Sequence, residues 1–557
     1  MMRCYEYVGH EKVYTLVSQI QYTEDNKENI MDYTRIKDLI DRKTAIDWFN
    51  NDQNDEFWLD PILWSDVVEG ASSYLDRTKH RILQFEHMVS IIDRVPKANG
   101  MWREGIWLHP GHRVLYHCCL IALIGRTDPN IPNCVYSYRK DTDLEDKTTY
   151  PFKKKMLRWK NYANDFRKVA LQESTQCVLV TDLSNYYDHI SISKLIGRLR
   201  LLLHSSITKD DELILELLEA LLKIWSKDDY GIPQNYDPSS YFGSLYLFPI
   251  DQNMLAKRYT YFRYVDDIRV CCQNEKQAIR ALSDLQEELH KDRLYLNSAK
   301  TKIVKKGSPE FDALVDISDD CMISEFETTI RSGVKEDIDK IVPKLKERIE
   351  FHSGSKGEDR KFRAYTNRIL DLMDYAEYRG VLASDVRRLV LERLVSNADR
   401  TDYWVKFLLP VIDASVVDKV FALLFEEKVI WNWQRYNLLR LLISNGVDLS
   451  TVIGKIDKVK DAHALSPSEL EKGLLLILIG KMSTQVMKSD LYPNYFSQQI
   501  GYFQQRCLII ALRELDNRSR NSIYDRIIQS NSDHKELVDY IKADKCKMVG
   551  IPKRADK

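Results

Sequence analysis

Residues 262–270 of this chain read Phe-Arg-Tyr-Val-Asp-Asp-Ile-Arg-Val, and this stretch decides the fold. Aromatic and β-branched residues flank Asp266 and Asp267, which predicts two strands over about residues 259–272 with the acids at a tight turn between them. An exposed hairpin turn is the ordinary explanation for such acids. It fits the apolar flanks poorly, because adjacent carboxylates repel each other and are costly to bury unless they are paired or bind a metal ion.

A second acidic position lies upstream, where residues 177–188 read Cys-Val-Leu-Val-Thr-Asp-Leu-Ser-Asn-Tyr-Tyr-Asp. The apolar run predicts a short strand that ends at Asp182, and taken alone this Asp would be a helix cap. Together with Asp266 and Asp267 it supplies the hard oxygen ligands that phosphoryl transfer to a nucleotide needs around two divalent ions, about 3.5–4 Å apart. These three acids are therefore the predicted catalytic and metal-binding residues, with two Mg²⁺ ions as cofactors.

The two segments resemble motifs A and C of the reverse-transcriptase palm, whose motif C is Tyr-x-Asp-Asp. Three further segments follow the order of that family. Residues 94–115 resemble the fingers block, Gly-Ile-Pro-Gln at 231–234 resembles motif B, and Leu-Asn-Ser-Ala-Lys-Thr at 296–301 resembles motif D. The resemblance covers roughly residues 80–310 and implies the α+β fingers and palm of a right-hand polymerase, with dNTPs as substrates.

The resemblance also implies which basic residues meet the nucleotide. Lys97 and Arg103 would hold the incoming triphosphate, since cationic side chains suit a polyanion. Arg113 belongs to the same fingers block. Lys300 of motif D is a candidate acid for the departing pyrophosphate. Two structural alternatives stay open, namely a solvated turn lysine at position 97 and an ion pair at the start of a helix for Arg113.

Two more positions follow from the same resemblance. Tyr187, five residues after Asp182, falls where the family keeps an aromatic that blocks a ribose 2′-hydroxyl, which predicts a preference for dNTPs over rNTPs. Gln234 belongs to motif B, which lies under the template and nucleotide. The family has Gly after this Gln and the chain has Asn235, a residue that tolerates positive φ better than most.

The last part of the chain has a different pattern. Beyond about residue 320, apolar residues recur at helical spacing, as in Val417, Val420, Phe421 and Leu424. We expect an N-terminal extension at 1–75, fingers and palm at 76–315, and an all-α helical-repeat (HEAT-like) domain at 316–557, although no strict repeat period is visible.

A palm followed by a helical domain, without a recognisable thumb, RNase H or maturase motif, resembles the bacterial abortive-infection and defence-associated reverse transcriptases of the unknown-group type. That resemblance implies anti-phage defence, homo-oligomers, and DNA synthesis that is protein-primed, lacks a conventional template or uses a companion non-coding RNA. Two alternatives remain: a conventional RNA-templated reverse transcriptase of the retron or intron type, and a helical scaffold whose palm binds nucleotides without polymerising them.

Composition limits the partners and the compartment. The 557 residues carry 82 Lys and Arg against 83 Asp and Glu, so any basic groove for nucleic acid must be a local arrangement. The ten cysteines form no C-x-x-C pair, which favours reduced thiols in a cytoplasmic protein. The most apolar run, Leu474–Ile479, is far shorter than the roughly 20 residues that cross a bilayer, so we expect no membrane partner.

Overall fold

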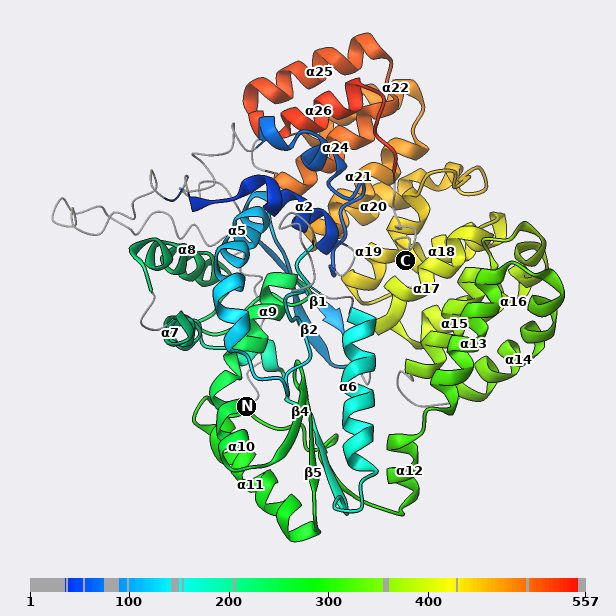
Figure 1. Ribbon diagram of the computed structural model, residues 1–557. Coiled ribbons are helices and arrows are strands. Elements are labelled where there is room, and N and C mark those ends of the chain that lie inside the picture. Colours follow the sequence, from blue (N-terminus) through cyan, green and yellow to red (C-terminus); the bar gives the residue numbers. More distant parts are fainter. Residues whose placement is uncertain are drawn as a thin grey trace, which may run out of the picture.

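A four-stranded antiparallel sheet lies at the base of the computed structural model, with strand order β4-β5-β3-β6 (Figure 1). The structure describes residues 36, 39–53, 56–74, 90–97, 100–141, 150–152, 155–203, 207–353, 360–426, 429–496 and 500–548. The strands are β3 (Cys177–Thr181), β4 (Thr260–Tyr264), β5 (Asp267–Cys272) and β6 (Lys302–Lys305). The expected strands on both sides of the paired acids are confirmed, whereas the edge strand β6 was not foreseen.

The register of the sheet brings the two acidic segments to one edge. Tyr264 pairs with Asp267 across the β4–β5 turn, and Thr181 pairs with Ile268 across β3–β5. Asp182 follows Thr181 directly, so it leaves β3 beside the start of β5. Side chains alternate between the faces of a strand, which leaves Val178 and Cys271 in one apolar layer and Leu179 and Val270 in the other.

Helices cover both faces of this sheet. Helix α6 (Lys155–Ala170) packs on one face, where Tyr162 and Phe166 lie among side chains of β3, β4 and β5. The opposite face meets α11 (Glu275–His290) and lies in the large core of the protein. Around them stand α7 (Ile192–Leu203), α8 (Lys209–Trp225), α9 (Asp237–Tyr246) and α10 (Phe248–Ala256).

A second, two-stranded sheet forms the expected fingers hairpin. Strands β1 (Ile91–Pro96) and β2 (Trp102–Trp107) are antiparallel, with Pro96 opposite Trp102, and α5 (Pro110–Thr127) follows. Pro96 followed by Asn99-Gly100 is turn chemistry, which indicates a hairpin tip here. Ala98 and Asn99 lie outside the described residues, while Gly100 has a φ of +76°, the left-handed conformation that glycine adopts without strain.

From residue 309 onward, every regular element in the described ranges is helical, which confirms the all-α prediction for this part. The HEAT-like repeat and the boundaries at 75 and 315 stay predictions. The α-helices are α12 (Pro309–Val315), α13 (Ser318–Ser332), α14 (Lys335–Ser353), α15 (Arg360–Leu372), α16 (Ala376–Ser396), α17 (Thr401–Leu408), α18 (Ala414–Phe425), α19 (Asn432–Ile443), α20 (Ile456–Leu465), α21 (Glu469–Met482), α22 (Gln485–Ser489), α23 (Leu491–Tyr495), α24 (Tyr502–Ala511), α25 (Asn517–Ser530) and α26 (Lys535–Lys542).

The helical part packs directly on the N-terminal segment and the fingers hairpin (Figure 1). Residues 56–74, which include α3 (Ser65–Glu69), lie between them. Arg506 of α24 forms fully buried ion pairs of 2.7 Å with Asp60 and 2.6 Å with Asp66. The Trp433 indole of α19 donates a 2.9 Å hydrogen bond to the carbonyl of Phe57. The hairpin and the C-terminal helices therefore share one hydrophobic core.

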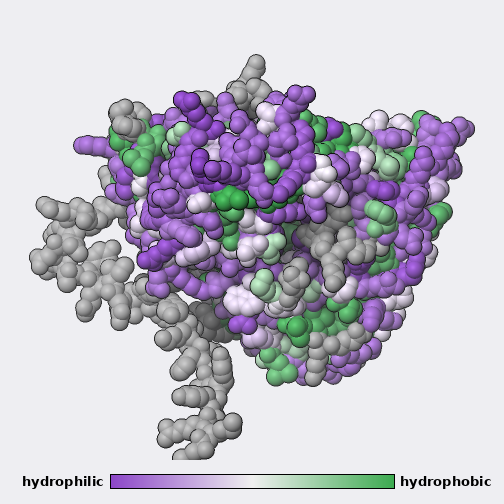
Figure 2. Space-filling model, turned by 90° about the horizontal axis from the view of Figure 1, so that it is seen from below, coloured by the Kyte–Doolittle hydropathy of each residue, from purple (hydrophilic) through white to green (hydrophobic). Residues whose placement is uncertain are grey.

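The outer surface is mostly hydrophilic when the molecule is seen from below, and its hydrophobic residues gather in separate patches (Figure 2). Within the described ranges, no helix is both long enough and apolar enough to cross a membrane. The nine cysteines in those ranges are all free thiols.

Candidate active site

The turn between β4 and β5 holds a strained residue next to the acids. Val265 has a φ of +56°, which is a true outlier for a β-branched residue and costs about 1–3 kcal/mol. Its backbone is held from both sides, because its N–H donates to Oγ of Ser137 at 2.9 Å and its carbonyl accepts from Arg263 at 2.8 Å. Such strain persists only where the surroundings impose it, so the position of Asp266 is set by its supports.

The three predicted acids come together at this edge of the sheet. Asp182 is 7% exposed, and Asp266 and Asp267 are half-buried. Burial, followed by the charges of Asp182 and Asp267, raises the pKa of Asp266 to about 7. Burial and the charge of Asp182 also raise the pKa of Asp267. The carboxylates are close enough to repel one another, which makes the site attractive to cations.

Lys300 lies in the turn just before β6 and contacts these acids. Its ammonium donates a 2.7 Å hydrogen bond to Oδ2 of Asp182, and the N–H of Asn297 donates to the Asp182 carbonyl at 2.7 Å. Burial by itself lowers the pKa of Lys300, but the hydrogen bond to Asp182 and the charges of Asp267 and Asp266 outweigh it and raise the pKa. Lys300 is therefore fully protonated at neutral pH.

Two cations of the fingers hairpin face the same region. The Lys97 ammonium donates to Oδ1 of Asn185 at 2.8 Å, in the loop after β3. Burial lowers the pKa of Lys97, and the nearby positive charges of Arg103 and Lys300 lower it further. The negative charge of Asp188 acts to raise it, but the pKa remains lowered. Three cationic side chains within electrostatic reach of one another form a place for a polyanion such as a triphosphate.

Arg103 belongs to β2 of the hairpin and lies near acids of the helical part. Its guanidinium stands 5.4 Å from the ring centroid of Phe57. Burial lowers the pKa of Arg103, while Asp399 and Asp402 of the C-terminal helical part, together with Asp188, act to raise it. The helical part thus places negative charge beside a residue expected to bind phosphate.

The motif B segment contacts the loop that follows β3. The Gln234 amide donates to Oδ1 of Asp188 at 3.3 Å. Asn235 has a φ of +66°, so it adopts the backbone conformation for which the family uses glycine, as its tolerance of positive φ led us to expect. The ring of Tyr187 packs beside Gly243 of α9, where a Cβ would stand 3.3 Å from the Tyr187 Cε1 atom. The small residue therefore leaves room for the aromatic.

Arg113 is not brought into this group. Its side chain is 1% exposed and forms ion pairs with Glu56 and, at 3.7 Å, with Asp52. Its guanidinium also stands 4.5 Å above the ring of Phe49. Burial and these ion pairs keep the guanidinium out of the group of site residues, and they favour the alternative of an ion pair at the start of α5.

A metal ion would find only part of its ligands here. Among the described residues, no group of three or more His, Cys, Asp or Glu side chains is arranged to hold an ion by itself. The acids of the site still fit Mg²⁺ in their donor chemistry, because this ion binds through one or two carboxylates plus substrate phosphates and waters. The three acids therefore offer carboxylate oxygens to a metal ion and leave coordination positions that waters or substrate phosphates can fill.

Several residues of the site carried no sequence signal. Asn185 and Asp188 anchor Lys97 and Gln234, and Asn185 has a φ of +46°. Asn and Asp are common in turns, so local sequence does not distinguish an anchoring Asn185 or Asp188 from an ordinary turn residue. Ser137, which supports Val265, lies in a loop with no recognised motif.

With this geometry in view, the comparison with protein families is decisive for residues 95–315, which match the model described as reverse transcriptase (RNA-dependent DNA polymerase). The chain contains a reverse-transcriptase domain. The matched range covers the end of β1, all of β2, the palm sheet and all three acids, which supports a nucleic-acid polymerase. None of the curated proteins matches the sequence.

Solved structures of telomerase are similar to the chain at low identity. The apo telomerase of Candida tropicalis truncated from the C-terminal domain is 12% identical, with 43% of this chain and 55% of that chain covered and a TM-score of 0.29. This chain thus spans about half the length of that structure. The apo telomerase of Candida tropicalis is 12% identical over 85% and 73% of the two chains, with a TM-score of 0.30. The telomerase of Candida albicans in complex with a TWJ fragment of telomeric RNA is 10% identical over 69% and 68%, with a TM-score of 0.28. At these TM-scores the likeness bears on neither mechanism nor partners.

Proposed function

We propose that this chain is a DNA polymerase of the reverse-transcriptase type that adds dNTPs by two-metal nucleotidyl transfer. One observation carries the proposal: Asp182, Asp266 and Asp267 meet at one edge of the palm sheet, with Lys300 and Lys97 beside them. A ring of acids next to a group of cations suits metal-bound phosphates better than either group alone. No such pairing is needed for a scaffold that does not catalyse.

The acids and cations have separate roles in this reaction. Asp182, Asp266 and Asp267 would hold two Mg²⁺ ions, which when bound neutralise the charge on the attacking and leaving oxygens. Lys97 and Arg103 bind and orient the triphosphate through the hairpin. The raised pKa of Lys300 keeps its ammonium protonated at Nζ, ready to donate a proton to the departing pyrophosphate. This ammonium would have to leave Asp182 before that carboxylate could hold a metal ion.

Two further residues select the substrate in this proposal. Tyr187 packs beside Gly243 of α9 and follows Asp182 by five residues, and its ring would meet a 2′-hydroxyl and exclude rNTPs. Gln234 lies on the motif B segment and is anchored to Asp188, so it would support the template or the nucleotide from below.

The biological setting follows from the layout of the chain. A reverse-transcriptase domain joined to a large helical part supports a role in anti-phage defence, in the cytoplasm, with DNA as the product. In that setting the enzyme forms homo-oligomers, and synthesis is protein-primed and proceeds without a conventional template or with a companion non-coding RNA. The contact between the helical part and the hairpin gives those helices a direct way to influence nucleotide binding.

A labelled-nucleotide assay tests the proposal. Purified protein is incubated with Mg²⁺ and labelled dNTPs, without template or primer, and then digested with protease. We expect label that migrates with the protein, is sensitive to protease, and is lost in Asp266→Ala but kept in Asp312→Ala, which removes an exposed acid of α12. Incorporation only with an added primer-template would favour a conventional reverse transcriptase. No incorporation under any condition, with companion RNA supplied, would favour the scaffold.

A further inference from the structure

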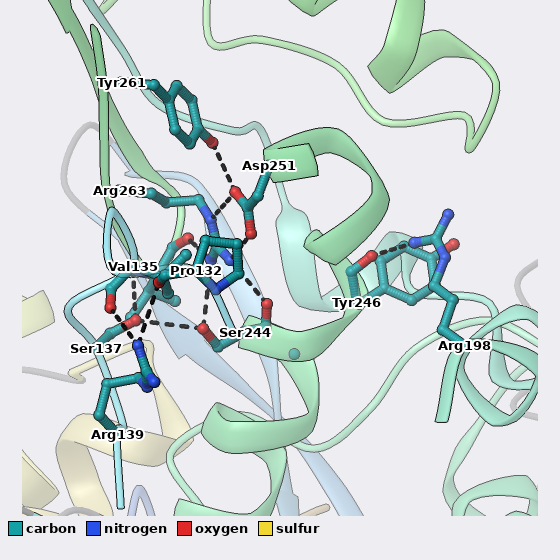
Figure 3. A network of polar contacts seen from close by, with 12 residues as sticks. Pro132, Val135, Ser137, Arg139, Arg198, Ser244, Tyr246, Asp251, Tyr261 and Arg263 are labelled. Carbon is teal, nitrogen blue, oxygen red and sulfur yellow. Dashed lines mark hydrogen bonds and ion pairs between the residues drawn. The ribbon is translucent and has the colours of Figure 1, made fainter. Parts of the chain in front are cut away.

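A fully buried arginine stands three residues before the first acid of the turn. Arg263 of β4 is 0% exposed, and its five N–H groups make five hydrogen bonds (Figure 3). Arginine has five donors, so none is left unsatisfied. Two bonds, of 2.7 and 2.5 Å, go to the carboxylate of Asp251 on α10. Two more, of 3.0 and 3.3 Å, go to the carbonyl and hydroxyl of Ser244 on α9.

The fifth bond reaches the strained turn itself. Nη1 of Arg263 donates to the carbonyl of Val265 at 2.8 Å. That carbonyl belongs to the peptide unit that leads into Asp266, so its direction decides where the acid points. Ser137 holds the N–H of the same residue at 2.9 Å and lies 3.4 Å from the hydroxyl of Ser244, so both supports meet in one buried network (Figure 3).

The pairing with Asp251 explains how a cation can be buried at this position. A buried guanidinium is tolerated when it is paired and its other donors are satisfied. Asp251 is also fully buried, and it accepts a further hydrogen bond of 3.0 Å from Tyr261. The orientation of Arg263 is thus fixed by α9 and α10, and the helices transmit that orientation to the turn.

We infer that Arg263 is a positioning residue. Its hydrogen bond to the Val265 carbonyl holds Val265 in the left-handed conformation and so directs the Asp266 carboxylate toward the metal site. Only the metal-binding role of the Asp266 carboxylate in this inference rests on the proposed function. Lysine would not replace Arg263, because a single ammonium cannot reach both the Asp251 carboxylate and the Val265 carbonyl in the fork geometry. Residues that orient metal ligands commonly change metal affinity or activity by about 10–100-fold when they are altered.

A matched arginine provides the control. Arg198 of α7 also pairs with a carboxylate, that of Asp292, and donates to a carbonyl, that of Tyr246, and its side chain is 11% exposed (Figure 3). Its hydrogen bonds and ion pair go to residues outside the β4–β5 turn. Arg198→Lys therefore reproduces the loss of a half-buried guanidinium fork without disturbing the acids.

The experiment measures metal binding apart from activity. The thermal unfolding of the full chain is followed during Mg²⁺ titration without nucleotide, and dNTP incorporation is measured separately. In Arg263→Lys we expect the half-saturating Mg²⁺ concentration to rise, and kcat to fall, by about 10–100-fold, with KM for dNTPs within about threefold of wild type. Arg198→Lys should leave the half-saturating Mg²⁺ concentration and kcat within about twofold.

A second variant, Ser137→Ala, tests the inference even if Arg263→Lys does not fold. Ser137→Ala removes the other hydrogen bond to Val265 and leaves both charges paired, so it should shift the Mg²⁺ midpoint in the same direction by a smaller factor. Unchanged midpoints and kcat in folded Arg263→Lys, or an unchanged midpoint in Ser137→Ala, would overturn the inference. A wild-type chain that binds Mg²⁺ but incorporates no dNTP would sink the proposed function, while the midpoints still test Arg263.

Discussion

The ammonium of Lys300 donates a 2.7 Å hydrogen bond to Oδ2 of Asp182, at the edge where β3 ends and β6 begins. In the protein without substrate, this cation offsets part of the repulsion among the three acids. In the proposed reaction, Mg²⁺ and the triphosphate would compete for the same partners, since the metal needs the carboxylate and the phosphates attract the ammonium. The pair would then link metal binding to the placement of the proposed proton donor.

Replacing Lys300 should affect the reaction far more than the fold. We expect Lys300→Met to lower kcat about 10²–10³-fold, because a positioned general acid contributes about 10²–10⁴-fold. The side chain is 64% exposed, so unfolding free energy should change by less than about 1 kcal/mol. Single-turnover incorporation and thermal denaturation measure the two effects. Lys302→Met is the control, and equal losses of kcat in both variants would contradict the role.

Asp266 should destabilise the metal-free protein at neutral pH. Its pKa is about 7 in the folded protein and about 4 in an unfolded chain. Between these values the folded state binds more protons, so unfolding free energy falls as pH rises from about 4 to 7. Asp266→Asn removes this term and should raise stability at pH 8 by about 1–2 kcal/mol, a figure reduced for solvent screening, with little change at pH 4.

Magnesium should reverse the order of stability of wild type and Asp266→Asn. Wild type gains stability from Mg²⁺ because the metal relieves the repulsion, whereas Asp266→Asn gains less. Denaturation curves at pH 4 and 8, with EDTA or with Mg²⁺, give the comparison. The interpretation fails if Asp266→Asn is the less stable protein at pH 8 in EDTA.

The aromatic gate gives a selectivity measurement. Tyr187→Ala should lower the ratio of kcat/KM for dNTP over rNTP about 10–100-fold, a size typical of discrimination by steric fit. Gly243→Ala places a Cβ 3.3 Å from the Tyr187 ring and should also change the ratio, because the ring must shift. Competition between labelled dATP and ATP measures it. A ratio that persists in Tyr187→Ala excludes the gate.

The helical part should be indispensable to the fold of the hairpin. Arg506→Leu leaves Asp60 and Asp66 buried without their partner, so we expect a loss of about 3–5 kcal/mol in unfolding free energy. Lys458→Leu, which breaks an exposed pair with Glu426, should cost less than about 1 kcal/mol. Urea denaturation compares them. Equal small losses would show that the two parts are coupled weakly.

Local pattern was enough to predict the chemistry-bearing elements. The apolar run of β3, the aromatic and β-branched flanks of Asp266 and Asp267 in β4 and β5, and the helical spacing beyond residue 320 are encoded over a few residues, since backbone geometry dictates which positions share a face. The acids were found for the same reason, because each sits where an apolar strand ends. Asn235 adopted positive φ through its own short side chain.

Only the tertiary structure decided which of these residues meet. Arg113 has the chemistry of a phosphate ligand, yet Glu56 and Asp52, far away in sequence, fold onto it and remove it from the site. Asp399 and Asp402 reach Arg103 by packing of the helical part, and Asp251 reaches Arg263 through α10. Periodicity states which face of an element is buried, but not the partner that buries it. The sequence by itself therefore determined the reverse-transcriptase domain and the three acids proposed for catalysis, and long-range packing determined which cations lie beside them and how their turn is held.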